Sequence, residues 1–97
     1  MKQSVKRKRP LSTFNERDKV IIDSIRGSGP LKKRMLEMGF IPETPLQILK
    51  YAPLYDPIEV KIKNAHISLR VAEANEILVV PVDIYRPGPV SLEEVKA

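Results

Sequence analysis

The stretch Gly29–Pro57, GPLKKRMLEMGFIPETPLQILKYAPLYDP, decides the fold of this chain. Pro30 suits the first position of a helix, because its missing N–H would be unpaired there anyway, and Gly39 suits the left-handed residue that ends one. A strand follows, and then a turn bounded by Pro53 and Pro57. This order of helix, strand and rigid turn predicts a small β-barrel with one inserted helix.

The helix carries an apolar stripe at helical spacing. Leu31, Met35 and Met38 are four and three residues apart, and Leu36 flanks them. Such a stripe is typical of a helix that packs one face on a core. We therefore expect these side chains to be buried, with Phe40 folding back onto the last turn.

Strands are expected on both sides of this helix. Ile58, Val60 and Ile62 alternate with polar residues, which indicates a half-buried strand. The fold class predicted is mainly β: a small SH3-like barrel of about five strands, one helix between strands 1 and 2, and a short helical turn before the last strand. The expected segments are strands within 17–26, 46–52, 58–63, 66–70 and 77–82, a two-residue link at Asn64-Ala65, and a helical turn within 71–76.

Composition divides the chain into three parts. Residues 1–13 are polar and cationic, so we expect a disordered basic tail there. Residues 14–83 are expected to form the barrel domain, and residues 84–97 a flexible C-terminal tail. At 97 residues the chain holds one small domain.

The net charge of +5 belongs to the first tail. Five of the 17 basic residues precede Pro10, which leaves twelve basic residues against the 12 acidic ones. Two interpretations of this tail remain open. It is a solvated end, or it contacts anionic lipid headgroups, which attract basic residues near a membrane surface. The residues available for that contact are Lys6, Arg7, Lys8 and Arg9.

The sequence lacks the marks of a metal centre or an enzyme. There is no cysteine, and the one histidine, His66, stands at a half-exposed strand position without a ligand set around it. No nucleophile motif or Gly-rich phosphate loop is present. No apolar run approaches the roughly 18–20 residues that span a bilayer. We expect no cofactor, no catalysis and a cytoplasmic location.

Several short motifs occur in a recognisable order along the chain: Met35, Met38, Gly39, Phe40 and Pro42; Ala52, Pro53, Leu54, Asp56 and Pro57; Ser68, Leu69 and Arg70; and Glu73 and Ala74. With these motifs, the chain from about Glu16 to Val80 resembles the FeoA family of ferrous iron transport accessory proteins, whose domain also ends some iron- or manganese-dependent repressors. The chain departs from the family pattern at Glu43 and Tyr55, where glycine is usual. If those turns need positive φ, either they are remodelled or Tyr55 is placed for contact at an exposed tip.

The resemblance implies an interaction module of bacterial iron uptake. Its expected partner is FeoB, the GTPase-coupled membrane transporter of Fe²⁺, met on the cytosolic face and without a small-molecule substrate. Transition metal ion binding is a property that the resemblance implies for the family as a whole, and no residue of this chain is predicted to bind a metal. The alternative is a stand-alone relative of the repressor C-terminal domain, or a small barrel that binds nucleic acid through its basic tail.

We expect the helix corner and the proline-bounded turn to present the partner-binding face. Arg34 and Arg70 admit two interpretations: an arginine finger toward a partner GTPase, or structural roles on the polar helix face and in an ion pair with Asp56 or Glu73. The predicted partner-binding residues are Arg34, Met38, Gly39, Phe40, Pro53, Leu54, Tyr55, Asp56, Pro57 and Arg70.

Overall fold

The computed structural model describes residues 8–83, which form a six-stranded antiparallel sheet around an apolar core. The strands lie in the order β1-β6-β2-β3-β4-β5. The elements are β1 (Arg9–Pro10), the 3₁₀ turn η1 (Leu11–Thr13), β2 (Lys19–Ile25), α2 (Pro30–Glu37), β3 (Pro45–Tyr51), the 3₁₀ turn η2 (Pro53–Tyr55), β4 (Ile58–Ile62), β5 (Ala65–Leu69), α3 (Val71–Ala74) and β6 (Ile77–Pro81).

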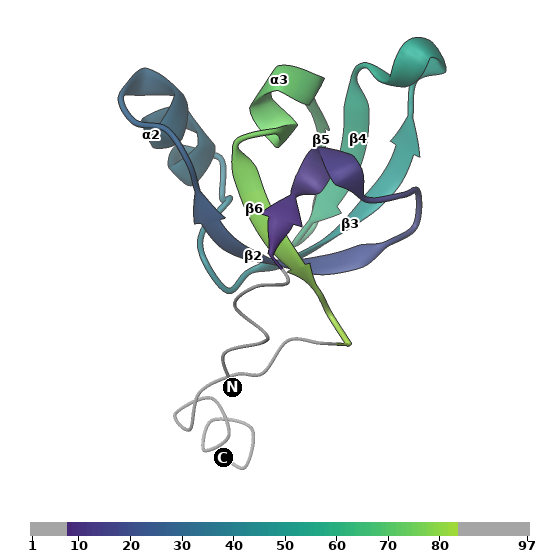
Figure 1. Cartoon of the computed structure of the whole chain (residues 1–97), viewed down its shortest axis with the longest axis horizontal. Coiled ribbons are helices and arrows are strands. Elements are labelled where there is room, and N and C mark those ends of the chain that lie inside the picture. Colours follow the sequence, from purple (N-terminus) through teal and green to yellow (C-terminus); the bar gives the residue numbers. More distant parts are fainter. Residues whose placement is uncertain (1–7, 84–97) are drawn as a thin grey trace.

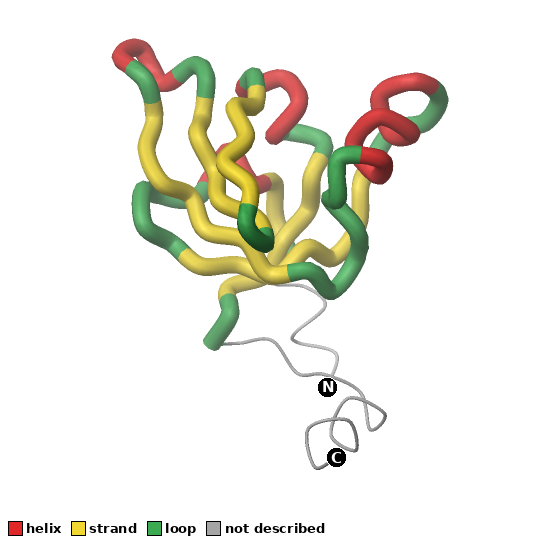
Figure 2. Tube along the Cα trace, turned by 180° about the vertical axis from the view of Figure 1, so that it is seen from behind, coloured by secondary structure: helices red, strands yellow, loops and turns green. Residues whose placement is uncertain are grey.

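The strands curl into a cup whose rim carries the helical elements. α2, α3 and the β3–β4 loop with η2 lie at one end, and the end of β6 lies at the other (Figure 1). Seen from behind, the strands converge away from this rim (Figure 2). The small SH3-like barrel is confirmed, with one strand more than expected. Because β1 comes first, the inserted helix stands between β2 and β3.

Two β-bulges rotate the inward face within a strand. In β2 the register shifts between Ile22 and Ser24, and in β3 between Ile48 and Lys50. A bulge adds one unpaired residue, so inward positions three apart replace the usual spacing of two. Ile48 is therefore followed inward by Tyr51, whose ring packs against the core.

The N-terminal boundary of the domain lies earlier than the sequence predicts. The expectation of disorder is wrong for residues 8–13, because β1 pairs with β6 and Leu11 is fully buried. Phe14 is buried beside it. The polar composition of this segment does not indicate these contacts, because a single leucine in a cationic run is enough to anchor the segment on the core. The predictions for residues 1–7 and 84–97 lie outside the described residues.

The helix and the following hairpin differ from expectation in detail. On α2 only Met35 is fully buried, whereas Leu36 and Met38 are exposed, so their assignment to the core is wrong. A helix at the rim of a small barrel has few neighbours to cover it. The β4–β5 turn is Lys63-Asn64 rather than Asn64-Ala65, because Ile62 pairs with Ala65.

Candidate functional site

The first part of the site is the corner where α2 ends. Gly39 adopts φ 105°, its N–H donates to Leu36 O (3.0 Å), and the Phe40 N–H donates to Met35 O (3.0 Å). These two bonds form a Schellman motif, which fixes the direction in which the chain leaves the helix. Phe40 is fully buried, so it anchors the corner from inside and its predicted contact with a partner is wrong.

The surface of this corner is apolar. Leu36 and Met38 are each 36% exposed, and Ile41 is 45% exposed. The sequence places Met38 both in the apolar stripe and on the partner-binding face, places Leu36 in the stripe alone, and does not single out Ile41. Helical spacing identifies the apolar side chains of a helix, but it does not show which of them a small core can cover and which remain exposed.

The second part is the turn between β3 and β4. Leu54 and Tyr55 have φ of 70° and 64° and are 93% and 71% exposed. Two backbone bonds hold the turn: the Tyr55 N–H donates to Ala52 O (2.7 Å) and the Ala52 N–H to Pro57 O (2.9 Å). The turn is therefore fixed while its apolar side chains stand in solvent.

Helix α3 connects the two parts. Arg34 of α2 forms an ion pair with Glu73 of α3, and the Asp56 Oδ1 accepts the Val71 N–H (3.1 Å) at the start of α3. Glu73 Oε1 also accepts the Arg70 N–H (3.0 Å), as a third-position glutamate does at a helix start. The corner and the turn therefore flank one short helix and are held to it.

These contacts bear on the two arginines. Of the two acids predicted as partners of Arg70, Glu73 pairs with Arg34 and Asp56 accepts the Val71 N–H. Within residues 8–83 no ion pair of Arg70 is found. The side chain of Arg70 borders a shallow hollow with Asp56, Pro57 and Ser68. Arg34 is engaged by Glu73, which favours its structural role.

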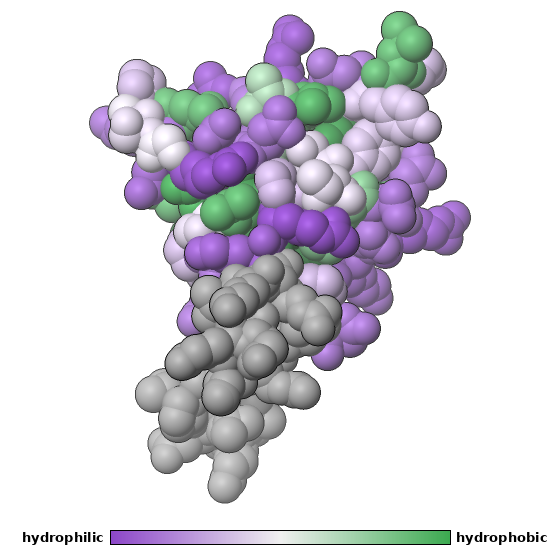
Figure 3. Space-filling model, viewed as in Figure 1, coloured by the Kyte–Doolittle hydropathy of each residue, from purple (hydrophilic) through white to green (hydrophobic). Residues whose placement is uncertain are grey.

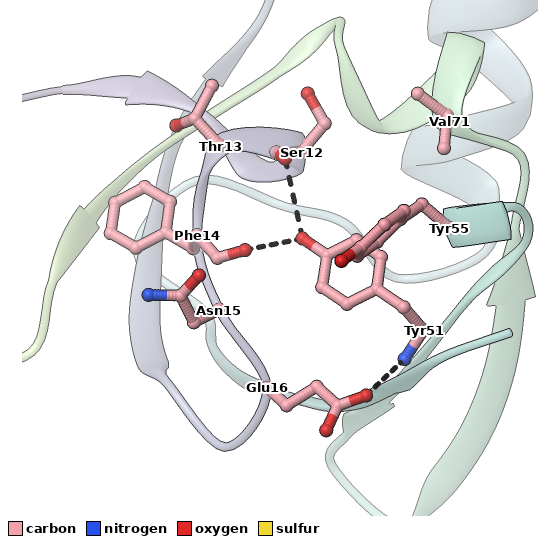
Figure 4. Close-up of a pocket in the computed structure, with 8 residues that line it drawn as sticks. All are labelled: Ser12, Thr13, Phe14, Asn15, Glu16, Tyr51, Tyr55 and Val71. Atoms are coloured by element: carbon pink, nitrogen blue, oxygen red, sulfur yellow. Dashed lines mark hydrogen bonds between the residues drawn. The ribbon is translucent and has the colours of Figure 1, made fainter. Parts of the chain in front are cut away.

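Beside the turn, two tyrosines border a groove (Figure 4). Their ring centroids are 5.6 Å apart at 69°, an edge-to-face arrangement. The Tyr51 hydroxyl donates to Phe14 O and lies 3.4 Å from Ser12 O, and Glu16 Oε2 accepts the Tyr51 N–H (3.0 Å). Burial, then the charges of Asp18 and Glu16, raise the pKa of Tyr51.

The basic residues at the start of the domain are used within it. Lys8 lies 3.3 Å from Asp23. Arg9 donates to Thr13 O (3.1 Å) and stacks over the ring of Phe14 at 3.8 Å. The contact of Lys6, Arg7, Lys8 and Arg9 with anionic lipid stays a prediction, and two of these residues, Lys6 and Arg7, lie outside the described part.

The exposed hydrophobic side chains are unevenly distributed over the surface. On the face shown in Figure 3, hydrophobic side chains reach the surface mainly toward the rim and at the tip of the β3–β4 loop.

Within residues 8–83 no group of three or more potential metal ligands occurs. No helix of that part of the chain has the length and apolar character needed to cross a bilayer.

The model of the FeoA domain matches residues 9–81 of this chain. The chain belongs to the FeoA family, which is associated with ferrous iron transport. The start of this FeoA domain at Arg9 agrees with the ordered β1 and the buried Leu11.

Relatives agree with the assignment of the FeoA domain. The chain is 36% identical over 67 residues to an Fe(2+) transport protein A/Fe(2+) transporter FeoB fusion protein of Porphyromonas gingivalis; the match covers 69% of this chain and 8% of that protein. The solution structure of iron(II) transport protein A from Clostridium thermocellum is 38% identical, with a TM-score of 0.72 over 76% of this chain and 46% of that one. An FeoA-like protein of Clostridium acetobutylicum is 25% identical, with a TM-score of 0.75, over 86% and 96%.

More distant likenesses show the fold alone. A Stenotrophomonas maltophilia FeoA described as an SH3 domain protein is 20% identical, with a TM-score of 0.64 over 72% of this chain and 87% of that one. A manganese-dependent transcriptional repressor is 22% identical, with a TM-score of 0.70 over 77% and 42%. At these identities they establish that the FeoA domain has an SH3-like fold.

The two departures from the family pattern keep the backbone that glycine would adopt. Glu43 has φ 73° and Tyr55 has φ 64°. Neither turn is remodelled out of the left-handed region. A residue with a Cβ costs about 1–2 kcal/mol there. At Tyr55 the FeoA domain thus combines an unfavourable backbone with a large exposed side chain.

Proposed function

We propose that this FeoA domain is an accessory module of ferrous iron uptake that binds an FeoB-type transporter on its cytosolic face and tunes its activity without catalysis. The observation that carries the proposal is the Porphyromonas gingivalis relative, whose name joins transport protein A and FeoB in one fusion protein. Tethering raises the effective concentration of two modules toward each other, so a fusion suits modules that act together.

The rim supplies the surface for this interaction. The end of α2 and the β3–β4 loop lie on opposite sides of α3 (Figure 1). Exposed apolar area is contributed by Leu36, Met38 and Ile41 at the first and by Leu54 and Tyr55 at the second. The hydrogen bonds of the corner and the turn hold these positions before binding. A surface that is already ordered loses less entropy on association. We therefore assign the partner contact to the rim rather than to the end of β6.

Arg34 and Arg70 have supporting roles in this proposal. The ion pair with Glu73 holds Arg34 against α3, and Arg70 is exposed beside Asp56 at the edge of the turn. A charge at the margin of an apolar patch typically steers the partner and sets the rate of association more than the affinity. The absence of a nucleophile motif in the sequence supports a role without chemistry.

A titration of the ¹⁵N-labelled chain with the cytosolic domain of an FeoB-type transporter tests the proposal. We expect shifts at the amides of Met38, Gly39 and Tyr55. Leu54→Ala should weaken binding about tenfold, because truncation of an exposed apolar anchor typically costs more than 1 kcal/mol of binding free energy. Val82→Ala is the matched control, since Val82 is 42% exposed at the other end of the barrel.

Three results would contradict the proposal. The first is no binding at high micromolar partner, and the second is shifts confined to the end of β6. The third is equal weakening by L54A and V82A.

The nucleic-acid alternative has less support. The likeness to the repressor concerns the fold alone, and Lys8 and Arg9 are engaged within the domain. Binding through phosphate contacts would weaken steeply with salt, so a gel shift at two salt concentrations distinguishes it.

A further inference from the structure

The groove beside Tyr51 has the form of a peptide site. Residues 12–16 make one wall, and Tyr51, Tyr55 and Val71 make the other, around a cavity of about 520 Å³ (Figure 4). The two rings stand edge to face, so much of this wall is aromatic. Aromatic grooves bind segments in the polyproline II conformation, because a preformed extended helix loses little entropy when it docks.

The polar groups around the groove suit such a segment. The Asn15 N–H donates to Asp18 Oδ2 (2.8 Å), whereas within residues 8–83 the side-chain amide of Asn15 and the hydroxyl of Tyr55 form no hydrogen bond. Both side chains border the groove and can donate to the free carbonyls of a polyproline II backbone. Glu16 uses Oε2 to accept the Tyr51 N–H, which leaves Oε1 for a cation. A carboxylate at the edge of an aromatic groove favours a segment that carries arginine.

The described part of the chain ends next to this groove. A second hollow is bordered by Pro81, Val82 and Asp83 on one side and by Phe14 and Arg17 on another. Phe14 borders both hollows, so the chain leaves the barrel one side chain away from the groove.

The next residues along the chain are Ile84-Tyr85-Arg86-Pro87-Gly88-Pro89. The Val82 N–H donates to Lys19 O, and Asp83 borders the second hollow together with Arg17 and Asp18, so the described chain ends beside the residues that follow Glu16. Three residues of a polyproline II segment would span about 9 Å from that point. The segment that follows the barrel therefore has the reach, the charge and the prolines that the groove requires.

We propose that the groove is a polyproline II site whose occupant is the chain's own segment Arg86–Pro89. The Arg86 guanidinium pairs with Glu16, and the two prolines pack against Tyr51 and Tyr55. The groove shares Tyr55 with the rim surface and otherwise rests on residues 12–16, Tyr51 and the end of β6.

A spin label on the tail tests this occupancy in the full-length chain. The chain has no cysteine, so Ser91→Cys provides a single attachment site for a nitroxide. We expect the amide signals of Asn15, Glu16 and Tyr55 to lose intensity several-fold relative to those of α2. An even loss across the domain, or a loss confined to other residues, would overturn the proposal.

Charge variants in the labelled chain test the pairing itself. Arg86→Gln and Glu16→Gln should each restore the lost intensity; glutamine at position 16 keeps an oxygen for the Tyr51 N–H, so the fold is preserved. Lys96→Gln removes the same charge as Arg86→Gln from outside the segment and should change nothing. Unchanged broadening in R86Q and E16Q would refute the pairing. Recovery on tenfold dilution would show that the occupant is the tail of a second copy instead.

Discussion

Replacement of Tyr51 by phenylalanine is expected to lower the free energy of unfolding by about 1–2 kcal/mol at neutral pH. The variant keeps the ring, and with it the edge-to-face contact with Tyr55, and removes only the hydroxyl that donates to Phe14 O. A hydrogen bond of this kind contributes about 0.5–1.5 kcal/mol, and the carbonyl that loses its donor in a partly buried site adds to the loss.

Tyr55→Phe is the matched control for this variant. Tyr55 is 71% exposed, and within residues 8–83 its hydroxyl forms no hydrogen bond, unlike that of Tyr51. Substitutions at such surface positions usually change stability by less than about 0.5 kcal/mol. The difference between the two variants therefore isolates the Tyr51 hydroxyl.

The same hydroxyl makes stability depend on alkaline pH. The pKa of Tyr51 is raised by burial first, and then by the charges of Asp18 and Glu16. Since the folded-state pKa lies above the unfolded value of about 10, the stabilisation is fully present below pH 10. It is lost as the pH rises through the folded-state pKa. Y51F should therefore lose less stability than the unmodified chain between pH 9 and the alkaline limit.

Urea denaturation followed by far-ultraviolet circular dichroism measures both effects. Equal stability of Y51F and Y55F at neutral pH would refute the role of the hydroxyl. An alkaline loss of stability in Y51F as large as in the unmodified chain would refute the titration argument.

Two other substitutions test the backbone and the core. Glu43→Gly should raise the free energy of unfolding, measured by urea denaturation, by up to about 1 kcal/mol. Glu43 has φ 73°, and glycine adopts that region without strain. A destabilised variant would show that the glutamate side chain has a stabilising contact. Phe40→Ala should lower it by about 3–5 kcal/mol, because a fully buried ring leaves a cavity. A small loss would mean that Phe40 is not the inner anchor of the α2 corner.

Much of the barrel could be predicted from local pattern. Ile58, Val60 and Ile62 alternate with polar residues, and all three are buried in β4. Pro30 and Gly39 bound the helix as their backbone chemistry requires. These predictions are correct because each depends on residues that are near one another in the sequence.

The errors concern features set by distant contacts. Leu11 is buried because β1 pairs with β6, and nothing near residue 11 announces that strand. The bulge after Ile48 turns Tyr51 toward the core, although a regular strand would place it on the other face. The size of the core determines which of Met35 and Leu36 is covered. The sequence indicates apolar character but not the room available for it.

The left-handed pair Leu54-Tyr55 has a consequence for how this loop can be modified. Selection for folding alone would favour glycine at both positions, and solubility would favour polar side chains at a tip that is 93% and 71% exposed. The loop meets neither demand, so it is a poor place for a neutral tag or insertion. Val82, which follows β6 and is 42% exposed, is the better attachment point for a probe that must leave the rim undisturbed.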